Sequence, residues 1–326
     1  MVKNRKAVLF NSTTSSNHLG CYLTSIGLRR LLAESGIEIV FECNVNQYDL
    51  SFAKMILDAN PTYLVVVNGE GTFHDDQPYA VFLINFLDVL TNKKLLLNSQ
   101  FKSMGRAHID KVKRFDLVQA RTKIDFEYGL KSGLNNTAYC PDMLFYSGIS
   151  NSLNSMSDSA KVVITDSHLS SETTRLFDAY KKMEKRAKWV NFHFLPSGGP
   201  KLPARYKRVV AGAIRKIYSG NYCYRAQNVL SRVDLSTLLA DFMSARGVIT
   251  GRYHGACLAI ALNKPLVYGN TNTSKIVDLC DDFGVGLRFD KFDVFTTEGW
   301  NKMNTKFDSR LLVDPYQSLI FSIRDL

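Results

Sequence analysis

Gly247-Val-Ile-Thr-Gly-Arg-Tyr-His-Gly-Ala-Cys-Leu-Ala-Ile-Ala-Leu-Asn-Lys-Pro-Leu-Val-Tyr268 is the stretch that decides the fold. An apolar, β-rich run ends at Thr250, a helix of small residues follows a short loop, and Pro265–Tyr268 is apolar again. A helix that joins two buried strands is typical of a parallel sheet. The stretch therefore predicts an α/β fold.

The same alternation of buried strands and amphipathic helices runs through the rest of the chain. In the first half we expect strands at Ala7–Phe10, Ile37–Glu42, Tyr63–Asn68, Lys94–Asn98 and Leu117–Ala120, with helices such as Leu19–Ala33 and Tyr79–Leu90. In the second half we expect strands at Lys161–Thr165, Lys188–Leu195, Gly247–Thr250 and Pro265–Tyr268, with helices at Thr173–Lys185 and Ser236–Ala245. This order predicts a doubly wound parallel sheet in each half.

Two domains account for the length of 326 residues better than one core does. The segment Ser147–Ser159 is rich in Ser and Asn and shows no periodicity, as expected of a linker. We therefore predict a Rossmann-like domain at 1–150 and a second one at 160–326, with the active site in the cleft between them. A helix at Pro315–Ile323 is expected to pack back on the first domain.

Composition excludes several classes of protein. Hydrophobic residues make up 45% and charged residues 22%, and no segment approaches the roughly 20 apolar residues of a membrane span. The apolar run Ala7–Phe10 is too short for a signal peptide, so we expect a cytoplasmic protein. Six cysteines lack metal-ligand spacing and are expected to be reduced, buried thiols: Cys21, Cys43, Cys140, Cys223, Cys257 and Cys280.

The net charge of +11 indicates an anionic partner. Basic residues gather in Lys102–Arg114, Lys181–Lys188 and Lys201–Lys216, without a nucleic-acid recognition motif beside them. Solvated helix faces are the plainer explanation of such runs. The alternatives are an anionic substrate and peripheral contact with an anionic membrane surface at the inner face of the membrane.

Ligands of open α/β sheets bind beyond the carboxyl ends of the strands, and two loops there are polar in the first half. Asn11–Gly20, with Asn17 and His18, leads into a helix N-terminus that suits an anion, although helix capping explains it equally well. In Asn68–Asp76, Gly69 and Gly71 allow a ligand near the backbone beside Thr72. The same loop offers acid or base groups at Glu70, His74, Asp75 and Asp76. Its glycines do not form the GxGxxG fingerprint, and an ordinary turn is the alternative.

The third loop carries the strongest signal. Arg252 and His254 lie two residues apart, so in an extended loop both side chains are expected to face one side. A helix N-terminus, which favours negative charge, follows directly. The sequence therefore predicts an anion site here.

With these motifs in this order, the chain resembles the polysaccharide pyruvyl transferase family over most of its length. Gly251–Gly255 is similar to the family's Ser-Arg-Leu-His segment. Asp234–Gly247 is similar to the stretch that leads into this segment, Ala256–Val267 is similar to the helix and strand that follow it, and Lys275 matches a lysine beyond that strand. In the first half, Asn68–Asp76 is similar to the family's Gly-Gly-Gly loop. Ala120-Arg121, with Tyr128–Gly133, is similar to its Arg-bearing strand end and the helix after it, and Pro141-Asp142 is similar to its Pro-Asp pair.

The resemblance implies a GT-B-like fold and an activity. Family members move a carboxyvinyl group from phosphoenolpyruvate onto two hydroxyls of a sugar, forming a pyruvate ketal, here on a cell-surface polysaccharide or a lipid-linked or polymeric precursor. Arg121, Arg252 and Lys275 would bind the donor, with Arg121 and Lys275 converging on it across the cleft. His254 would handle a proton or contact phosphate, with Glu70, Asp75 or Asp76 assisting the acceptor. The acceptor would be held by Asn17, His18, Asn68, Gly69, Gly71 and Thr72. No metal or cofactor is expected, because the cations supply the electrostatic stabilisation.

Two departures from the family pattern concern the acceptor side. The first loop has Gly20-Cys21 where the family commonly has Gly-Asp, and the glycine triplet is reduced to Asn68-Gly-Glu-Gly71. Two other functions therefore stay open. One is a GT-B glycosyltransferase that uses a CMP- or UDP-sugar, and the other is a catalytically inactive binding protein for acidic glycans.

Overall fold

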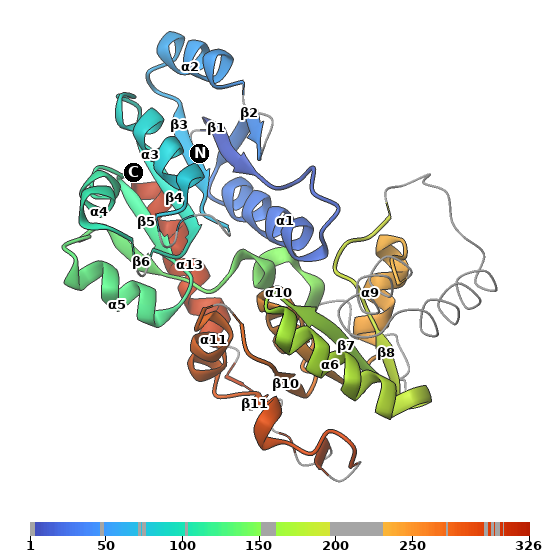
Figure 1. The fold of residues 1–326 in the computed structure, drawn as a ribbon. Helices are drawn as coiled ribbons and strands as arrows, with labels where there is room; N and C mark the ends of the chain where they lie inside the picture. The colour runs from blue at the N-terminus through green and yellow to red at the C-terminus, as the bar shows by residue number, and fades with distance from the viewer. Residues whose placement is uncertain are drawn as a thin grey trace. The chain divides into compact units, whose positions relative to one another are not determined.

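The computed structural model describes residues 4–45, 49–70, 73, 76–101, 104–150, 161–195, 231–271, 273–296, 299–300, 303, 307–308 and 310–326. Contacts divide the chain into two compact units, and each is built on a parallel sheet with helices (Figure 1). Unit 1 comprises Met1–Ser16, Cys21–Ser147 and Asp308–Leu326, and unit 2 comprises Asn17–Gly20 and Gly148–Phe307. Of the expected linker, residues 151–159 lie outside the described part.

Unit 1 contains a six-stranded parallel sheet in the order β2-β1-β3-β4-β5-β6. Its strands are β1 (Arg5–Ser12), β2 (Ile37–Asn44), β3 (Leu64–Asn68), β4 (Lys94–Ser99), β5 (Leu117–Ala120) and β6 (Thr137–Tyr139). The five strands expected in this half are confirmed. The sequence analysis missed β6, since three partly buried residues give no periodicity to detect.

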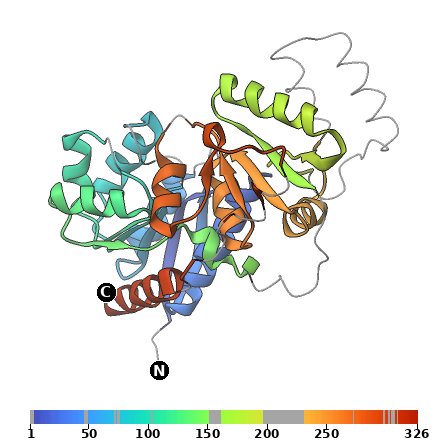
Figure 2. The same cartoon turned by 90° about the horizontal axis from the view of Figure 1, so that it is seen from below.

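Helices cover both faces of this sheet, which explains why a central strand such as β3 is apolar and buried throughout. The helices are α1 (Leu19–Glu34), α2 (Leu50–Ala59), α3 (Pro78–Asp88), α4 (Arg106–Val112), α5 (Lys123–Lys131) and α13 (Arg310–Asp325), with a 3-10 turn, η1 (Met143–Ser147). Val8, Phe10, Val65 and Val67 pack into one core cluster with residues of α2 to α5. α1 and α13 lie on the other face (Figure 2).

The last helix, α13, is longer than the expected Pro315–Ile323 and contacts β5 and β6. Its buried face carries Tyr316, whose hydroxyl donates to the carbonyl oxygens of Pro141 (3.2 Å) and Asp142 (2.6 Å). These bonds fasten the C-terminal helix to the segment that follows β6.

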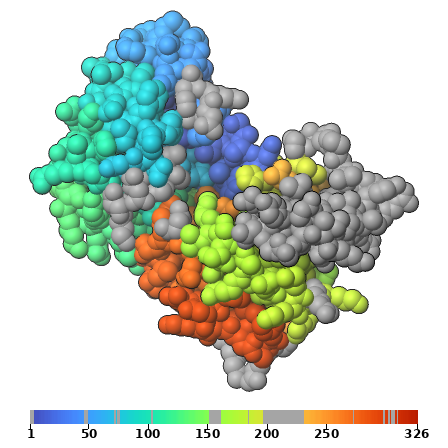
Figure 3. Space-filling view, in the orientation of Figure 1, coloured from blue at the N-terminus to red at the C-terminus, as the bar shows by residue number. Residues whose placement is uncertain are grey.

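Unit 2 contains a five-stranded parallel sheet in the order β11-β10-β9-β7-β8. Its strands are β7 (Val162–Ser167), β8 (Ala187–Trp189), β9 (Gly247–Gly251), β10 (Leu266–Tyr268) and β11 (Leu287–Arg288). Its helices are α6 (Ser170–Met183), α9 (Leu235–Met243), α10 (Tyr253–Ala261) and α11 (Lys275–Phe283), with 3-10 turns η3 (Glu184–Arg186) and η4 (Phe289–Lys291). α6 packs on β7 and β8, on the face opposite α10 (Figure 2), and forms part of the near surface in Figure 3.

The expected strand at Lys188–Leu195 is wrong beyond Trp189, where β8 ends. Beyond it the chain pairs with the segment Asn17–Gly20, which belongs to the same unit. Leu19 N donates to the Phe192 oxygen, Phe194 N donates to the Asn17 oxygen, and His18 forms an antiparallel bridge with His193. The apolar run predicts one strand because a period-2 pattern does not reveal a change of partner.

Each sheet has one point where the order of the strands reverses. In unit 1 the chain goes from β1 to β2 on one side and then to β3 on the other, and in unit 2 it goes from β7 to β8 and then to β9. The carboxyl ends of the strands at such a switch point are where ligands of open α/β sheets bind. The loops after β1 and β3, and those after β7 and β9, are therefore the places to examine.

Gly27 in α1 should tolerate no side chain. A Cβ atom there would lie 1.8 Å from the carbonyl oxygen of Met143, which is backbone and has little freedom to move. We expect Gly27→Ala to lower the free energy of unfolding by about 1–3 kcal/mol, despite the better helix propensity of alanine. Urea unfolding measures this, with the exposed Arg30→Ala of the same helix as the control. Equal stability of the two variants would contradict the close packing of α1 on η1.

Candidate functional site

The site in unit 2 begins with tightly joined strand ends. The hydroxyls of Thr165 in β7 and Thr250 in β9 lie 2.6 Å apart, and both residues are fully buried. The backbone NH of Arg252 donates to the Thr250 hydroxyl at 2.9 Å. Gly251 lets the strands approach, since a Cβ atom there would lie 2.3 Å from the Cβ of Ser167. The switch point is thus a rigid platform for the residues that follow each strand.

Arg252 is held in one orientation by a carboxylate at the end of β7. It has extended backbone geometry at the N-cap of α10. Its Nε donates to Oδ1 of Asp166 at 2.7 Å, and its second terminal nitrogen (NH2) donates to Oδ2 at 2.6 Å. The first terminal nitrogen (NH1) lies 3.2 Å from each ring nitrogen of His168. Bidentate pairing of one side of a guanidinium leaves its terminal edge directed away from the carboxylate, in the geometry that suits a bound anion.

Four of the six histidines lie in this unit: His18, His168, His193 and His254. The ring of His18 stacks on Phe192 with centroids 5.4 Å apart, and meets His193 at 5.0 Å and His254 at 6.0 Å edge to face. His168 and His193 are exposed, and His18 and His254 are partly buried. A cluster of this kind brings several groups that can change charge near neutral pH to one place.

Burial and nearby charges lower the pKa of His18, His168 and His193 and so favour the neutral forms of these three rings. Loss of solvation lowers the pKa of His18 to about 2, helped by the charges of His254, His193 and Arg252. Loss of solvation, then the charge of Arg252, lowers the pKa of His168, against a raising effect of Asp166. The pKa of His193 is lowered for similar reasons, by loss of solvation and by Arg232 and Arg252. An anion placed here would oppose the charge effects and favour the protonated rings.

Lys275 adds a further cation. It is the first residue of α11, directly after the N-cap Ser274, and is partly buried. Its charge contributes to lowering the pKa of His168, so the two side chains influence one another electrostatically. The structure thus brings Arg252 and Lys275, two of the three predicted donor residues, toward the same histidine.

The expected extended loop through His254 is wrong, because α10 begins at Tyr253 and His254 lies in its first turn. Its ring packs instead on Gly20, where a Cβ atom would lie 2.3 Å from both Cγ and Nδ1 of the imidazole. The glycine of the Gly20-Cys21 pair is therefore needed for close approach. His254 and Arg252 still reach a common neighbourhood, since both lower the pKa of His168 and of His18.

In unit 1, Glu70 belongs to a buried polar network at the ends of β1 and β3. Its Oε2 accepts from the Thr13 hydroxyl at 2.7 Å and lies 3.4 Å from Nδ2 of Asn68. Burial, then the charge of Glu70, raises the pKa of the Cys21 thiol well above its usual value. Gly69 donates to the Leu97 oxygen at 2.7 Å and is closely approached by Ser99 of β4. These residues form one network, within which Asn68 and Gly69 stay predicted acceptor residues.

Asp76 and Arg121 have engaged side chains in the structure. Both carboxylate oxygens of Asp76 accept from the NH of Gly105 (2.8 and 3.0 Å), and Oδ1 is 2.7 Å from Nδ1 of His108. These contacts, that with Gly105 first, lower the pKa of Asp76. Arg121 is 2% exposed and pairs with the fully buried Asp142 at 3.1 Å. For Asp76 to act in catalysis, or for Arg121 to bind the donor, each side chain must either keep these contacts while also binding substrate or give them up to bind it.

Several predicted positions are not covered by this geometry. Gly71, Thr72, His74, Asp75 and the basic segment 201–216 lie outside the described residues. Asn17 and His18 belong to unit 2, whereas Asn68 and Gly69 belong to unit 1. Convergence of Arg121 and Lys275 on one donor depends on the placement of the two units and stays a prediction.

The sequence analysis missed Asp166 and His168. Both follow the predicted strand Lys161–Thr165 directly, and a polar Asp-Ser-His run at that place is the same kind of signal as the loops that were selected. The strand order shows why this Asp-Ser-His run belongs to the site, because only the sheet topology puts the end of β7 beside the end of β9.

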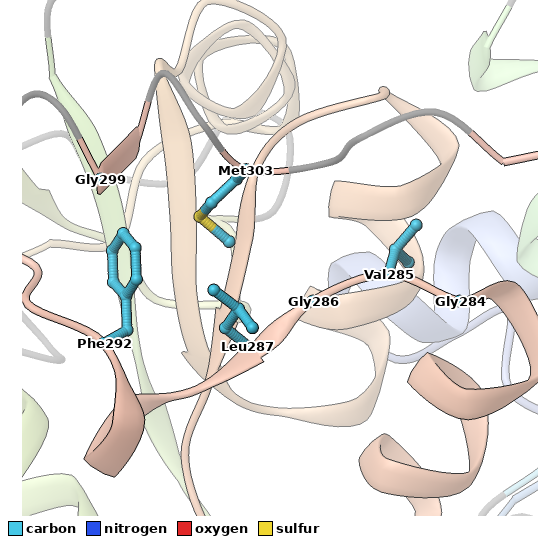
Figure 4. Close-up of a pocket in the computed structure, with 7 residues that line it drawn as sticks. All are labelled: Gly284, Val285, Gly286, Leu287, Phe292, Gly299 and Met303. Atoms are coloured by element: carbon cyan, nitrogen blue, oxygen red, sulfur yellow. The ribbon is translucent and has the colours of Figure 1, made fainter.

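A separate hollow of about 430 Å³ lies at the opposite, amino edge of the unit 2 sheet (Figure 4). It is lined by Gly284, Val285, Gly286, Leu287, Phe292, Gly299 and Met303. Val285 and Gly286 precede β11, and nearby Trp300 packs on Gly247, the first residue of β9. Its mostly apolar lining does not match the anionic ligand that the charge distribution favours.

Two further observations bear on ligands and location. Among the residues that the structure describes, no group of three or more His, Cys, Asp or Glu side chains is arranged to hold a metal ion. Within the same described ranges, no helix combines the length and the apolar character that crossing a bilayer requires.

Comparisons with known proteins agree with this fold. UDP-GlcNAc 2-epimerase of Methanocaldococcus jannaschii, solved in complex with UDP-GlcNAc and UDP, is 13% identical, with a TM-score of 0.58 over 98% of this chain and 99% of that one. A UDP co-structure of S. aureus MnaA is 12% identical, with a TM-score of 0.53 over 97% and 95%. No curated protein sequence matches the chain. The model of one family, polysaccharide pyruvyl transferase, matches residues 18–268.

Loss of Asp166 should destabilise unit 2, because the partly buried Arg252 would lose its two charge-assisted hydrogen bonds. We expect Asp166→Asn to lower the free energy of unfolding by about 1.5–3 kcal/mol. The control is Asp178→Asn, which breaks the exposed pair with Lys181 and should cost less than about 1 kcal/mol. Denaturant titration of both variants checks this, and a smaller effect at Asp166 than at Asp178 would refute it.

Proposed function

This chain belongs to the polysaccharide pyruvyl transferase family, and we propose that it transfers a carboxyvinyl group from phosphoenolpyruvate to a sugar, forming a pyruvate ketal. Family membership makes it a transferase. The proposed acceptor is a sugar of a cell-surface polysaccharide or of its lipid-linked or polymeric precursor. The proposed location is the cytoplasm, with peripheral contact at the inner face of the membrane for an acceptor held there.

The observation that carries the donor proposal is the cation arrangement at the β7/β9 switch point. Phosphoenolpyruvate presents a phosphate and a carboxylate, and its recognition needs several cations on rigid elements. Arg252 is aligned by Asp166, and Lys275 begins a helix whose N-terminus favours negative charge. The imidazoles of His18, His168 and His193 add hydrogen-bonding groups beside these cations, and their lowered pKa values favour rings that add no further positive charge.

The proposed reaction needs one proton delivered and one leaving group released. A proton adds to the methylene carbon of phosphoenolpyruvate, and a sugar hydroxyl attacks the resulting cationic carbon and loses its proton. The second hydroxyl then forms the other carbon–oxygen bond and loses its proton as the bond to phosphate breaks, and the released phosphate takes up that proton. His254 is our candidate for proton handling. In unit 1, Glu70, Asp75 or Asp76 is our candidate for the group that assists the acceptor; Glu70 already accepts from Thr13, and Asp76 from Gly105.

A nucleotide-sugar transferase is the second candidate, because the epimerase of similar fold was solved with UDP-GlcNAc and UDP. Both candidates need cations for phosphate. Thermal stabilisation by phosphoenolpyruvate, compared with stabilisation by UDP-sugars and CMP-sugars, discriminates between them. Preferential stabilisation by a nucleotide sugar would replace the donor that we propose.

Arg252→Ala should weaken phosphoenolpyruvate binding by roughly tenfold to a hundredfold, as expected for the loss of charge-assisted contacts worth about 1.5–3 kcal/mol. Calorimetric titration measures this affinity. Lys181→Ala is the matched control, since it removes one positive charge from the exposed last turn of α6 in the same unit. An equal loss of affinity in both variants would assign the effect to net charge and reject the specific contact.

His254→Gln should reduce turnover by about a hundredfold or more, the usual contribution of a positioned acid or base. Glutamine keeps side-chain volume against Gly20, so the fold should persist in the circular dichroism spectrum. Phosphate release from phosphoenolpyruvate, followed with a panel of sugar acceptors and by the mass of the product, measures the activity. The exposed Lys181→Ala of α6 is the control, and near-normal turnover of the His254 variant would remove His254 from the mechanism.

A further inference from the structure

We propose that His168 is a further anion-binding residue of the β7/β9 site and takes up a proton when a dianion binds there. The proposal rests on the proposed function only for the identity of the natural ligand, the phosphate group of phosphoenolpyruvate. The site itself would accept any dianion of similar size.

The position of His168 beside Arg252 is the first support. One terminal nitrogen of Arg252 lies 3.2 Å from both ring nitrogens of His168, so the guanidinium lies directly against the imidazole. His168 is exposed, whereas Arg252 and Asp166 are 23% and 13% exposed at their side chains. An anion that reaches the terminal edge of Arg252 from solvent therefore comes within reach of the imidazole.

The loop that carries His168 is fixed on both sides. The NH of Ser167 donates to the Thr173 hydroxyl at 2.9 Å, and that hydroxyl donates back to the Ser167 oxygen at 2.9 Å. The Ser167 hydroxyl donates to the Asn270 oxygen at 2.8 Å and accepts from the Leu169 NH at 3.2 Å. These bonds join the loop to α6 and to the segment after β10. The backbone that carries His168 is consequently held in place before a ligand arrives, which reduces the entropy lost on binding.

Charge balance predicts the direction of proton movement. The groups that act on His168 are Arg252 and His254 at the start of α10, Lys275 at the start of α11 and Asp166 at the end of β7. His18, of the segment Asn17–Gly20, is coupled to it as well. Among the described residues that act on His168, the fixed charges are those of Arg252, Lys275 and Asp166, which sum to plus one, so a bound dianion would leave an excess of negative charge. A proton on His168 removes this excess.

The affinity for a dianion should therefore rise as the pH falls. Loss of solvation, and then the neighbouring cations, lower the pKa of His168 from its usual 6.5, and a bound dianion would raise it, so binding takes up a proton in the pH range between the two values. By linkage, one proton taken up corresponds to at most a tenfold gain in affinity per pH unit. A dianion released at higher pH leaves the imidazole neutral again.

Sulfate tests the proposal, because it stays a dianion throughout the neutral range and any proton uptake then belongs to the protein. Calorimetric titrations at one pH in two buffers of different ionisation enthalpy give the number of protons taken up. We expect a net uptake in the wild type. We expect His168→Asn to remove most of it, to weaken sulfate binding by roughly tenfold and to flatten the pH dependence. His108→Asn, in unit 1, should leave all three unchanged.

Three results would overturn the proposal: no sulfate binding, unchanged proton uptake in His168→Asn, or uptake that disappears in His254→Asn while His168→Asn retains it. Measuring phosphoenolpyruvate turnover distinguishes failure of this proposal about His168 from failure of the proposed function. Turnover without His168-dependent uptake would reject only the role of His168. Normal sulfate behaviour without binding or turnover of phosphoenolpyruvate would keep the anion site and reject the proposed donor.

Discussion

The bidentate pair between Asp166 and Arg252 is the constraint on which the unit 2 site depends. It links the carboxyl end of β7 to the N-cap of α10 and fixes a guanidinium that would otherwise have many rotamers. The pair is partly buried, where charge-assisted bonds count for more than at a fully exposed surface. The orientation of the remaining edge of Arg252, and the position of His168 against it, follow from this one contact.

Neutral histidines are the second consequence of this arrangement. Loss of solvation, and then fixed charges such as Arg252, lower the pKa of His18 and His168, so these rings keep hydrogen-bonding capacity without adding positive charge. The same rings can become charged when an anion arrives. A site with this property balances the ligand's charge more closely than a set of fixed cations can, since the number of protons it holds depends on the ligand.

Unit 1 uses polar groups differently at the ends of its strands. Asp76 binds the NH of Gly105 at the N-cap of α4, and Arg121 pairs with Asp142 beside the carbonyls that hold Tyr316 of α13. These contacts join segments far apart in the sequence and give both residues structural roles. Glu70 lies among the residues at the ends of β1 and β3, with Thr13 and Asn68 among its partners.

The sequence by itself determined the fold class, most strands and the importance of Arg252, since buried parallel strands are apolar runs and a charged loop after such a run is easily seen. It could not determine that β8 ends at Trp189, that α10 begins at Tyr253, or that Asp166 and His168 belong with Arg252. Those facts depend on which strands are neighbours, and β7 and β9 are separated by a long stretch of chain. Periodicity records whether a residue is buried; only the tertiary structure decides which residue it meets.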